Sequence, residues 1–299
     1  MRRVLEERGG LSETEANDAI ARGAVFVDAR RADAPELKIA VGARVRVHFE
    51  RARSDAARGL EVTAVALPTT PSESAPALHL RARILFLDDA AIFADKPAGL
   101  AAQTPLEGGA ALPDYVATLI GGPALLVHRL DRDTTGVTVL ARTTEAQRQL
   151  QRAFREGAAR KEYLALIAGC PPEERWTVDA PLGADPDAPR RSVRKTGSPA
   201  ITDFEIVERF DRAGVALLLC RPRTGRTHQI RAHAAHAGYP LLGDAKYGGP
   251  RQITLPDGTR LPAPRPFLHA ARLRLPPAYD VAAPLPEDMK SILAKLRSV

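Results

Sequence analysis

The segment HRLDRDTTG, residues 128–136, directly follows the short apolar run ALLV at residues 124–127. An apolar run of this kind predicts a strand, and the turn after a strand is usually built from uncharged residues such as Gly and Asn. This turn instead carries two arginines and two aspartates within residues 129–133. Asp131 is therefore a candidate turn residue, metal ligand or nucleophile. The choice between these roles depends on the motifs elsewhere in the sequence.

The composition favours a soluble protein with an anionic partner. Of the 299 residues, 44% are hydrophobic and 26% are charged, which is typical of one large globular domain or two smaller ones. The formal net charge of +7 favours a polyanion such as nucleic acid. Two clusters of basic residues without acids, at residues 190–195 and 221–231, indicate either phosphate contacts or a solvated face.

The cysteines and the apolar runs bear on the cellular compartment. Cys170 and Cys220 each end an apolar run, and two such distant thiols form neither a zinc pattern nor a disulfide framework. We expect buried free thiols and a reducing environment. No apolar run reaches the length of a membrane span, and the N-terminus lacks the apolar core of a signal peptide. We therefore expect a cytoplasmic protein without a membrane partner.

The chain divides into three predicted parts: a small module at residues 1–66, a Pro/Ser-rich linker at 67–81 and a larger domain at 82–299. The small module contains a helix pattern at residues 11–23, with Ser12 as its N-cap, followed by strand patterns at 24–29 and 43–49. A helix and short strands in this order resemble an S4-type α+β RNA-binding module.

Strand patterns dominate the larger domain. Residues 82–100 contain two apolar runs around an Asp-Asp turn, and residues 137–141, 161–169 and 214–220 each predict a further strand. Several of these are joined by short turns, which favours antiparallel neighbours. We expect an α+β domain with a mixed, mainly antiparallel central sheet flanked by helices.

Two helices are predicted in the same domain. The first begins at Thr144 as N-cap, with Gln147 as its capping-box partner, and ends at Gly157. The second begins after Thr227 as N-cap and ends at Gly238.

Two kinds of metal site are conceivable from these patterns. DRDTT at residues 131–135 matches the DxDx[TV] pattern of haloacid-dehalogenase-like phosphotransferases, whose carboxylates hold magnesium. That pattern should follow an uninterrupted apolar strand, and the only later acid in GDAKYGG is Asp244, so a magnesium site is hard to assemble. His228, His233 and His236 lack the acid and spacing of a zinc protease. We expect no metal.

Six motifs together resemble the RluA-type pseudouridine synthases. HRLD with TTG at residues 128–136 is similar to that family's core motif HRLDxxTSG, and TGRTHQIRAH at 224–233 is similar to its second hallmark. Four further matches follow in the family's order over roughly residues 82–280: DKPAGL, Lys161 with Tyr163, GYPLLGDAKYG and LHAARL. The resemblance implies the pseudouridine synthase fold and the isomerisation of uridine in structured RNA, ribosomal RNA being favoured over transfer RNA. Because isomerisation consumes no electrons or ATP, the resemblance implies no cofactor, and we expect a monomer.

By this resemblance the catalytic residues are Asp131, Tyr163 and Arg231. Asp131 is the implied nucleophile, and a carboxylate in a pocket that excludes water needs a cation to remain ionised. An arginine supplies that charge at any relevant pH. The end of the second motif assigns the role to Arg231, with Arg226 as the fallback. Tyr163 would stack on uracil and place its hydroxyl for proton transfer.

The remaining site residues are implied substrate contacts. Arg129 would take the place of the flipped base, because an enzyme that acts on a paired base must extrude it. Lys96 would help to form the rim of the cleft. The complete set of implied substrate contacts is His128, Arg129, Arg226, Thr227, His228 and Lys96.

Two positions depart from the family pattern, and one alternative function remains. Thr135 stands where the family has serine, and Gln103 stands where a histidine often follows DKPAGL. The alternative is a non-catalytic RNA-binding or ribosome assembly factor on the same fold. A magnesium-dependent phosphoaspartyl hydrolase is disfavoured.

Overall fold

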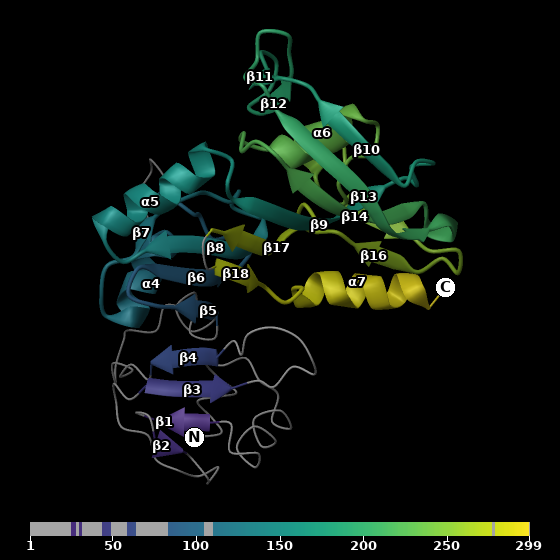
Figure 1. Cartoon of the computed structure of the whole chain (residues 1–299). Coiled ribbons are helices and arrows are strands. Elements are labelled where there is room, and N and C mark those ends of the chain that lie inside the picture. Colours follow the sequence, from purple (N-terminus) through teal and green to yellow (C-terminus); the bar gives the residue numbers. More distant parts are fainter. Residues whose placement is uncertain are drawn as a thin grey trace. The chain divides into compact units, whose positions relative to one another are not determined.

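The computed structural model describes residues 83–104, 110–276 and 279–298, together with four strands nearer the N-terminus (Figure 1). These strands are β1 (Val25–Val27), β2 (Arg30–Arg31), β3 (Arg44–His48) and β4 (Gly59–Thr63). They pair antiparallel in the order β2-β1-β3-β4. The strands predicted at residues 24–29 and 43–49 are therefore confirmed, whereas the helix predicted at 11–23 and the linker predicted at 67–81 lie outside the described residues.

The chain forms two compact units that alternate along the sequence. The first contains residues 1–95, 112–127 and 139–147, and the second contains residues 96–111, 128–138 and 148–299. Every residue that the sequence places in the candidate site belongs to the second unit.

The first unit contains a short strand pair that confirms the Asp-Asp turn. Strands β5 (Ile84–Leu87) and β6 (Ala91–Lys96) are antiparallel, and Asp88 Oδ1 accepts hydrogen bonds from the backbone N–H groups of Ala90 (2.8 Å) and Ala91 (2.7 Å). Such a carboxylate stabilises a turn by satisfying backbone donors. The other elements are α4 (Leu112–Ile120), β7 (Leu125–Leu126) and the strand β8 (Thr135–Ala141), whose residues divide between the two units.

Helix α5 (Thr144–Arg155) begins one residue earlier than predicted. The N-cap is Thr143 and not Thr144, because Thr143 Oγ1 accepts from the Ala146 backbone N–H at 3.1 Å. Gln147 does not close a capping box, since its side-chain amide donates to the Leu126 carbonyl at 2.8 Å. The predicted end is confirmed: Gly157 has φ +73°, and its N–H donates to the Phe154 carbonyl.

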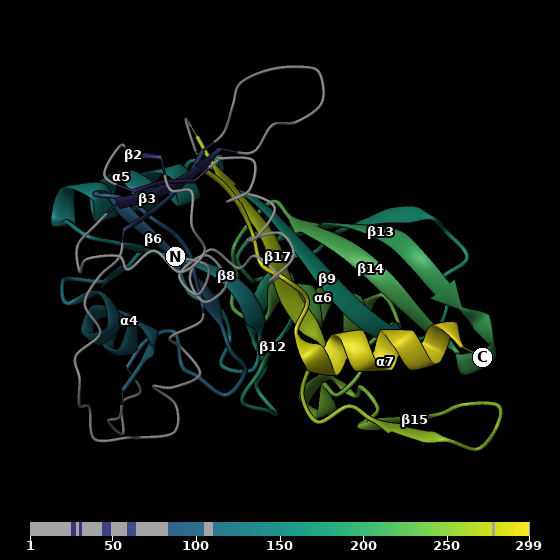
Figure 2. The same cartoon turned by 90° about the horizontal axis from the view of Figure 1, so that it is seen from below.

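The second unit is built on a mixed, mainly antiparallel sheet, which confirms the predicted α+β class. Its order is β10-β13-β14-β9-β17-β8, and only the β17–β8 pairing is parallel among those described. Figure 2 shows β13, β14, β9 and β17 side by side. The new strands in this order are β9 (Arg160–Ala168), β10 (Arg175–Asp179), β13 (Ile201–Phe210), β14 (Val215–Pro222) and β17 (Leu268–Leu275).

Smaller elements complete this unit. Strand β18 (Tyr279–Ala282) pairs antiparallel with the end of β17, off the main strand order, and two hairpins lie outside the sheet. The hairpins pair β11 (Leu182–Ala184) with β12 (Arg191–Val193), and β15 (Gln252–Thr254) with β16 (Arg260–Pro262). The helical segments are η1 (Asp211–Ala213), α6 (Gln229–His236), η2 (Ala245–Tyr247) and α7 (Glu287–Arg297).

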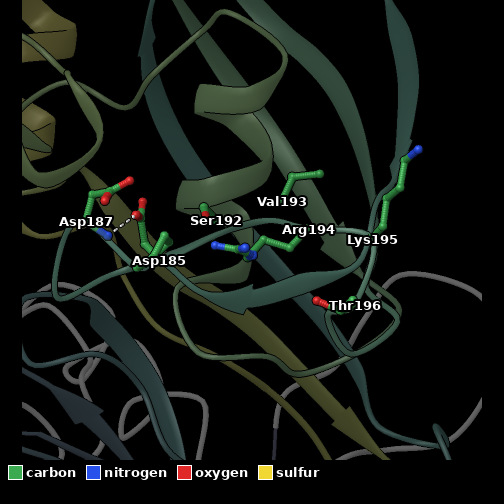
Figure 3. Close-up of a pocket in the computed structure, with 8 residues that line it drawn as sticks. Asp185, Asp187, Ser192, Val193, Arg194, Lys195 and Thr196 are labelled. Atoms are coloured by element: carbon green, nitrogen blue, oxygen red, sulfur yellow. Dashed lines mark hydrogen bonds between the residues drawn. The ribbon is translucent and has the colours of Figure 1, made fainter.

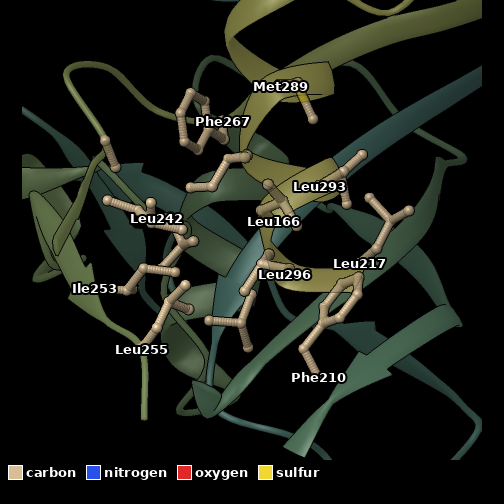
Figure 4. Close-up of a cluster of buried hydrophobic side chains, with 14 residues drawn as sticks. Leu166, Phe210, Leu217, Leu242, Ile253, Leu255, Phe267, Met289, Leu293 and Leu296 are labelled. Carbon is tan, nitrogen blue, oxygen red and sulfur yellow. The ribbon is translucent and has the colours of Figure 1, made fainter. Parts of the chain in front are cut away.

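Alternation along β9 and β14 gives the sheet two apolar faces. Leu166 and Leu217 pack in a core with Met289 and Leu293 of α7 (Figure 4). Their neighbours in sequence point to the opposite face, where they pack against α6. Tyr163 belongs to this second face, since it lies an even number of residues from the members of that core on β9. The sheet thus directs Tyr163 toward the side that carries α6.

The two cysteines are free thiols, as predicted. Cys220 is fully buried and Cys170 is partly exposed. Within the described residues, none of the helices combines the length and the apolar character needed to cross a bilayer.

Candidate active site

The turn that carries Asp131 is held in place by backbone packing. The Thr134 N–H donates to the Asp131 carbonyl at 3.1 Å, and Gly136 pairs with Ala270 of β17 in parallel register. Gly136 has φ +109°, and a Cβ at this position would lie 2.2 Å from the Ala270 carbonyl oxygen. Only glycine fits both the conformation and the contact. The glycine of the core motif therefore fixes where the turn meets β17.

Thr135 anchors the same turn through its side chain. Its hydroxyl hydrogen-bonds Nδ1 of the fully buried His269 at 2.9 Å. The substitution of threonine for the family's serine thus retains the hydroxyl group that makes this contact.

Lys96 supports the turn from inside and does not line the cleft rim. Its side chain is fully buried (0% exposed), and Nζ donates to the carbonyls of Arg132 (2.7 Å), Leu100 (2.8 Å) and Pro97 (2.9 Å). The expectation of a substrate contact is corrected, because these carbonyls accept the hydrogens of a buried ammonium group. Arg265 acts similarly: it donates to the Asp133 carbonyl at 3.2 Å while it pairs with Asp288.

Arg231 is the arginine that reaches Asp131. From α6, its Nη1 donates to Asp131 Oδ2 at 3.0 Å, while Nε and Nη2 donate to Asp244 at 2.6 and 2.8 Å. Burial alone would lower the pKa of Arg231, but the hydrogen bonds and charge of Asp244, and then Asp131, outweigh it and raise the pKa above its usual value. Arg226, the fallback, is exposed and donates to the Pro199 carbonyl.

The two acids around Arg231 differ in exposure. The Asp244 side chain is 1% exposed, whereas that of Asp131 is 24% exposed. Asp244 is therefore placed to hold the guanidinium, and Asp131 keeps part of its carboxylate surface exposed. Because both Asp244 oxygens are occupied by Arg231, this residue does not provide the second acid of a magnesium site.

His228 begins α6 in an unusual backbone conformation. It is the N-cap, with φ +58°, and it is the only residue other than glycine with positive φ within the described ranges. Thr227 is therefore not the N-cap; it is exposed, one residue too early. The Gln229 side chain accepts from the Arg226 N–H (2.9 Å) and from the Thr224 hydroxyl (2.7 Å), which fixes the segment before the helix.

The His228 ring lies between Asp131 and Tyr247. Nε2 is 3.8 Å from Asp131 Oδ2, and Nδ1 is 3.0 Å from the Tyr247 hydroxyl. Burial lowers the pKa of His228, and the negative charge of Asp131 opposes this only in part. The ring is consequently neutral near pH 7. His228 and Arg231 both lie beside Asp131, but only Arg231, which is within the helix, hydrogen-bonds it; His228 is the N-cap.

Tyr163 is electrostatically linked to Asp131. Burial, followed by the negative charge of Asp131, raises the pKa of the Tyr163 hydroxyl, which therefore stays protonated. Lys161 lies on the same face of β9 and donates to the Thr224 carbonyl at 2.7 Å. Burial lowers the pKa of Lys161 to about 8.

His128 and Arg129 differ in environment. The His128 ring stacks on Phe154, with ring centroids 4.6 Å apart, and burial together with the charge of Lys161 lowers its pKa to about 3. The His128 imidazole is thus neutral at physiological pH. Arg129 is exposed, and its Nη1 donates to Gln103 Oε1 at 3.3 Å. Gln103 stands at the position where the family often has histidine.

Several arginines of the two basic clusters are paired with acidic side chains. In the first, Arg190 pairs with Asp185 at 2.8 Å; in the second, Arg221 and Arg223 pair with acids on β13. A pocket lined by residues 185–187 and 192–196 lies at the first cluster, where Arg194 extends toward Asp185 and Lys195 points away (Figure 3). This pocket does not include Asp131.

Asp244 and Tyr247 were not predicted as site residues. Tyr247 is buried, its ring centre is 5.2 Å from Arg231 Cζ, and its hydroxyl contacts His228. Both residues belong to GYPLLGDAKYG, so the motif match was the available signal for them.

Comparison with known proteins identifies the family. Residues 91–236 match the family model described as RNA pseudouridylate synthase. Over 256 residues the chain is 39% identical to ribosomal large subunit pseudouridine synthase D of Nitrosomonas europaea, covering 81% of this chain and 73% of the relative. It is 40% identical over 203 residues to the dual-specificity RNA pseudouridine synthase RluA of Escherichia coli, covering 66% of this chain and 88% of the relative. The chain belongs to the RluA-type RNA pseudouridine synthases.

The fold of this pseudouridine synthase agrees with the same family. The structure of human RNA pseudouridylate synthase domain containing 4 is similar, with a TM-score of 0.60 and 27% identity over 74% of this chain and 95% of that one. The residues matched by the family model, 91–236, include both the Asp131 turn and α6. Family membership makes the chain an isomerase and overturns the phosphotransferase alternative.

Proposed function

We propose that this pseudouridine synthase uses Asp131 as its nucleophile, with Arg231 as the cation that keeps the carboxylate ionised and Tyr163 as the ring that stacks on uracil. The 3.0 Å contact between Arg231 and Asp131 carries the proposal. Because Asp244 binds two nitrogens of the guanidinium, only one remains on Asp131. The carboxylate therefore keeps exposed surface for a substrate while its charge is compensated.

The chemistry places definite demands on these residues. Pseudouridylation breaks the bond between ribose C1′ and uracil N1, forms a bond from C1′ to C5, moves the proton off C5 and leaves one on N1. No electron is gained or lost, and a positioned nucleophile with a closed pocket meets the requirement. Burial raises the pKa of Tyr163, so its hydroxyl stays protonated and is able to donate a hydrogen bond.

Structured RNA is the proposed substrate, and ribosomal RNA is favoured over transfer RNA. Relatives in Nitrosomonas europaea and Xanthomonas campestris bear the name ribosomal large subunit pseudouridine synthase D. Arg129, two residues before Asp131, is exposed, and its guanidinium donates to the neutral side chain of Gln103. We propose that it fills the space of the extruded base.

The organisation of the chain is part of the same proposal. Residues 1–66 would form an S4-like RNA-binding module, 67–81 a linker and 82–299 the catalytic domain. We further propose that the enzyme acts as a monomer in the cytoplasm and needs no cofactor.

The nucleophile is tested by release of tritium from RNA labelled at uridine C5, because isomerisation removes that hydrogen. We expect Asp131→Asn to lower the rate on the order of a thousandfold or more. Asp133→Asn is the matched control, since Asp133 is an exposed acid in the same turn. It should retain the rate within about twofold. Full activity in Asp131→Asn would exclude the proposed nucleophile.

The choice of RNA is tested separately. Pseudouridine mapping across total RNA from cells with and without this chain should show sites in ribosomal RNA that require it. If only transfer RNA sites disappear, the preference for ribosomal RNA is wrong while the nucleophile assignment is untouched.

A further inference from the structure

Tyr247 lies where the β11–β12 hairpin meets the start of α6. Its hydroxyl accepts from the Arg191 backbone N–H at 3.1 Å and donates to the Arg191 carbonyl at 2.9 Å. The same oxygen is 3.0 Å from Nδ1 of His228. One buried hydroxyl therefore connects the backbone of the basic hairpin to a ring that faces Asp131.

The hydrogen-bonding capacity of a phenol decides which way the last contact runs. A hydroxyl has one hydrogen and two lone pairs. The hydrogen is donated to the Arg191 carbonyl, and one lone pair accepts from the Arg191 N–H. The remaining lone pair can only accept, so the hydrogen in the contact with His228 belongs to Nδ1.

This assignment determines the character of the other ring nitrogen. A neutral imidazole that carries its hydrogen on Nδ1 has a bare Nε2, which is a hydrogen-bond acceptor. Nε2 lies 3.8 Å from Asp131 Oδ2, too far for a hydrogen bond. Two acceptors thus stand side by side, on side chains that are 16% (His228) and 24% (Asp131) exposed. The charged groups that act on this ring are Asp131, Arg231, Lys246 and Asp244.

The backbone of His228 is consistent with a functional constraint. Its φ of +58° is costly for a residue with a Cβ and is retained only where the surroundings enforce it. The Tyr247 hydroxyl is one of those surroundings, because it holds the ring that this backbone presents.

We propose that Tyr247 is a positioning residue: with its hydroxyl oriented by the hairpin backbone, it holds His228 with the hydrogen on Nδ1 and keeps Nε2 as an acceptor beside Asp131. His228 is then the group that touches the substrate, and Tyr247 acts through it. This inference rests on the proposed role of Asp131 for its place in the reaction, but its structural content can be measured without any turnover.

The first test is ¹⁵N NMR of the full-length protein labelled at histidine. Bare and hydrogen-bearing ring nitrogens resonate far apart, and the spectrum of His228→Gln assigns the signals. At neutral pH we expect a hydrogen-bearing Nδ1 and a bare Nε2 in the wild type. Tyr247→Phe should shift the ring toward the form with the hydrogen on Nε2, whereas the control Tyr239→Phe should not. A wild-type ring with its hydrogen on Nε2 would overturn the proposal.

The second test is kinetic and uses the tritium-release assay. Tyr247→Phe keeps the ring beside Arg231 and removes only the hydroxyl. We expect kcat to fall about tenfold, with KM for RNA within about twofold. Because Tyr247 acts through His228, Tyr247→Phe combined with His228→Gln should be no slower than His228→Gln alone. Multiplying losses would refute the coupling, and a native NMR spectrum shows that each variant is folded.

Discussion

Asp244 and Asp131 share one guanidinium. Substituting Asp244 by asparagine should mainly lower stability, whereas substituting Asp131 should mainly lower activity. Asp244→Asn keeps the side-chain shape but removes the charge that pairs with Arg231 at 2.6 and 2.8 Å. The new amide group also turns an N–H₂ toward a guanidinium that can only donate. Arg231 is then a buried cation whose one remaining carboxylate contact is Asp131, at 3.0 Å.

The magnitude follows from burial. Both partners are nearly inaccessible, with side-chain exposures of 9% for Arg231 and 1% for Asp244, and breaking a buried pair by removing one partner costs about 3–5 kcal/mol. Because Asp131 still compensates part of the charge, we expect the free energy of unfolding to fall by about 3 kcal/mol. Asp131 is 24% exposed and makes one of the three contacts, so Asp131→Asn should change stability by about 1 kcal/mol or less.

Urea unfolding measures this difference. Trp176 is the only tryptophan in the chain and belongs to the same unit as Arg231, so its fluorescence follows the relevant transition. For Asp244→Asn we expect a lower midpoint with an unchanged dependence on urea. Asp131→Asn should lose tritium release while its unfolding curve stays near that of the wild type. An Asp244→Asn curve within about 1 kcal/mol of wild type, or an equal loss in both variants, would refute the division of roles.

Two further predictions concern His128 and Gly136. Because the pKa of folded His128 is about 3 against an ordinary 6.5, the unfolded chain binds its proton first, and stability should be lost as pH falls through this window. His128→Phe keeps a ring on Phe154, and its unfolding free energy should fall less between pH 7 and about 4.5 than that of the wild type. Gly136→Ala forces a Cβ to within 2.2 Å of the Ala270 oxygen at φ +109°. This substitution should lower the free energy of unfolding, measured with denaturant, by about 3 kcal/mol, and activity should fall with it. An unchanged free energy of unfolding would show that β17 moves away from the new Cβ at little cost.

The elements that the sequence predicted well are those whose pattern is local. The run at residues 161–169 became β9 because its largely apolar residues fit a strand covered on both faces. The contact between Asp131 and Arg231 was predicted from two motifs a hundred positions apart, which no local pattern connects. That prediction depended on the family resemblance.

The errors share a different cause: they depend on tertiary partners. Adjacent threonines at 143 and 144 both suit an N-cap, and the choice is made by which hydroxyl meets the Ala146 N–H. A lysine reads as a surface residue, and Lys96 is buried only because three carbonyls converge on it. Thr227 has the right chemistry for a cap, but His228 takes the left-handed conformation that starts α6.

Asp244 is instructive because its function follows from what Arg231 would do without it. A guanidinium with a single carboxylate partner tends to bind both oxygens of that carboxylate at once. Bound in that way, Asp131 would offer little free surface to a substrate. Asp244 occupies Nε and Nη2 and leaves Nη1 for Asp131. The buried acid thus sets the geometry of the exposed one.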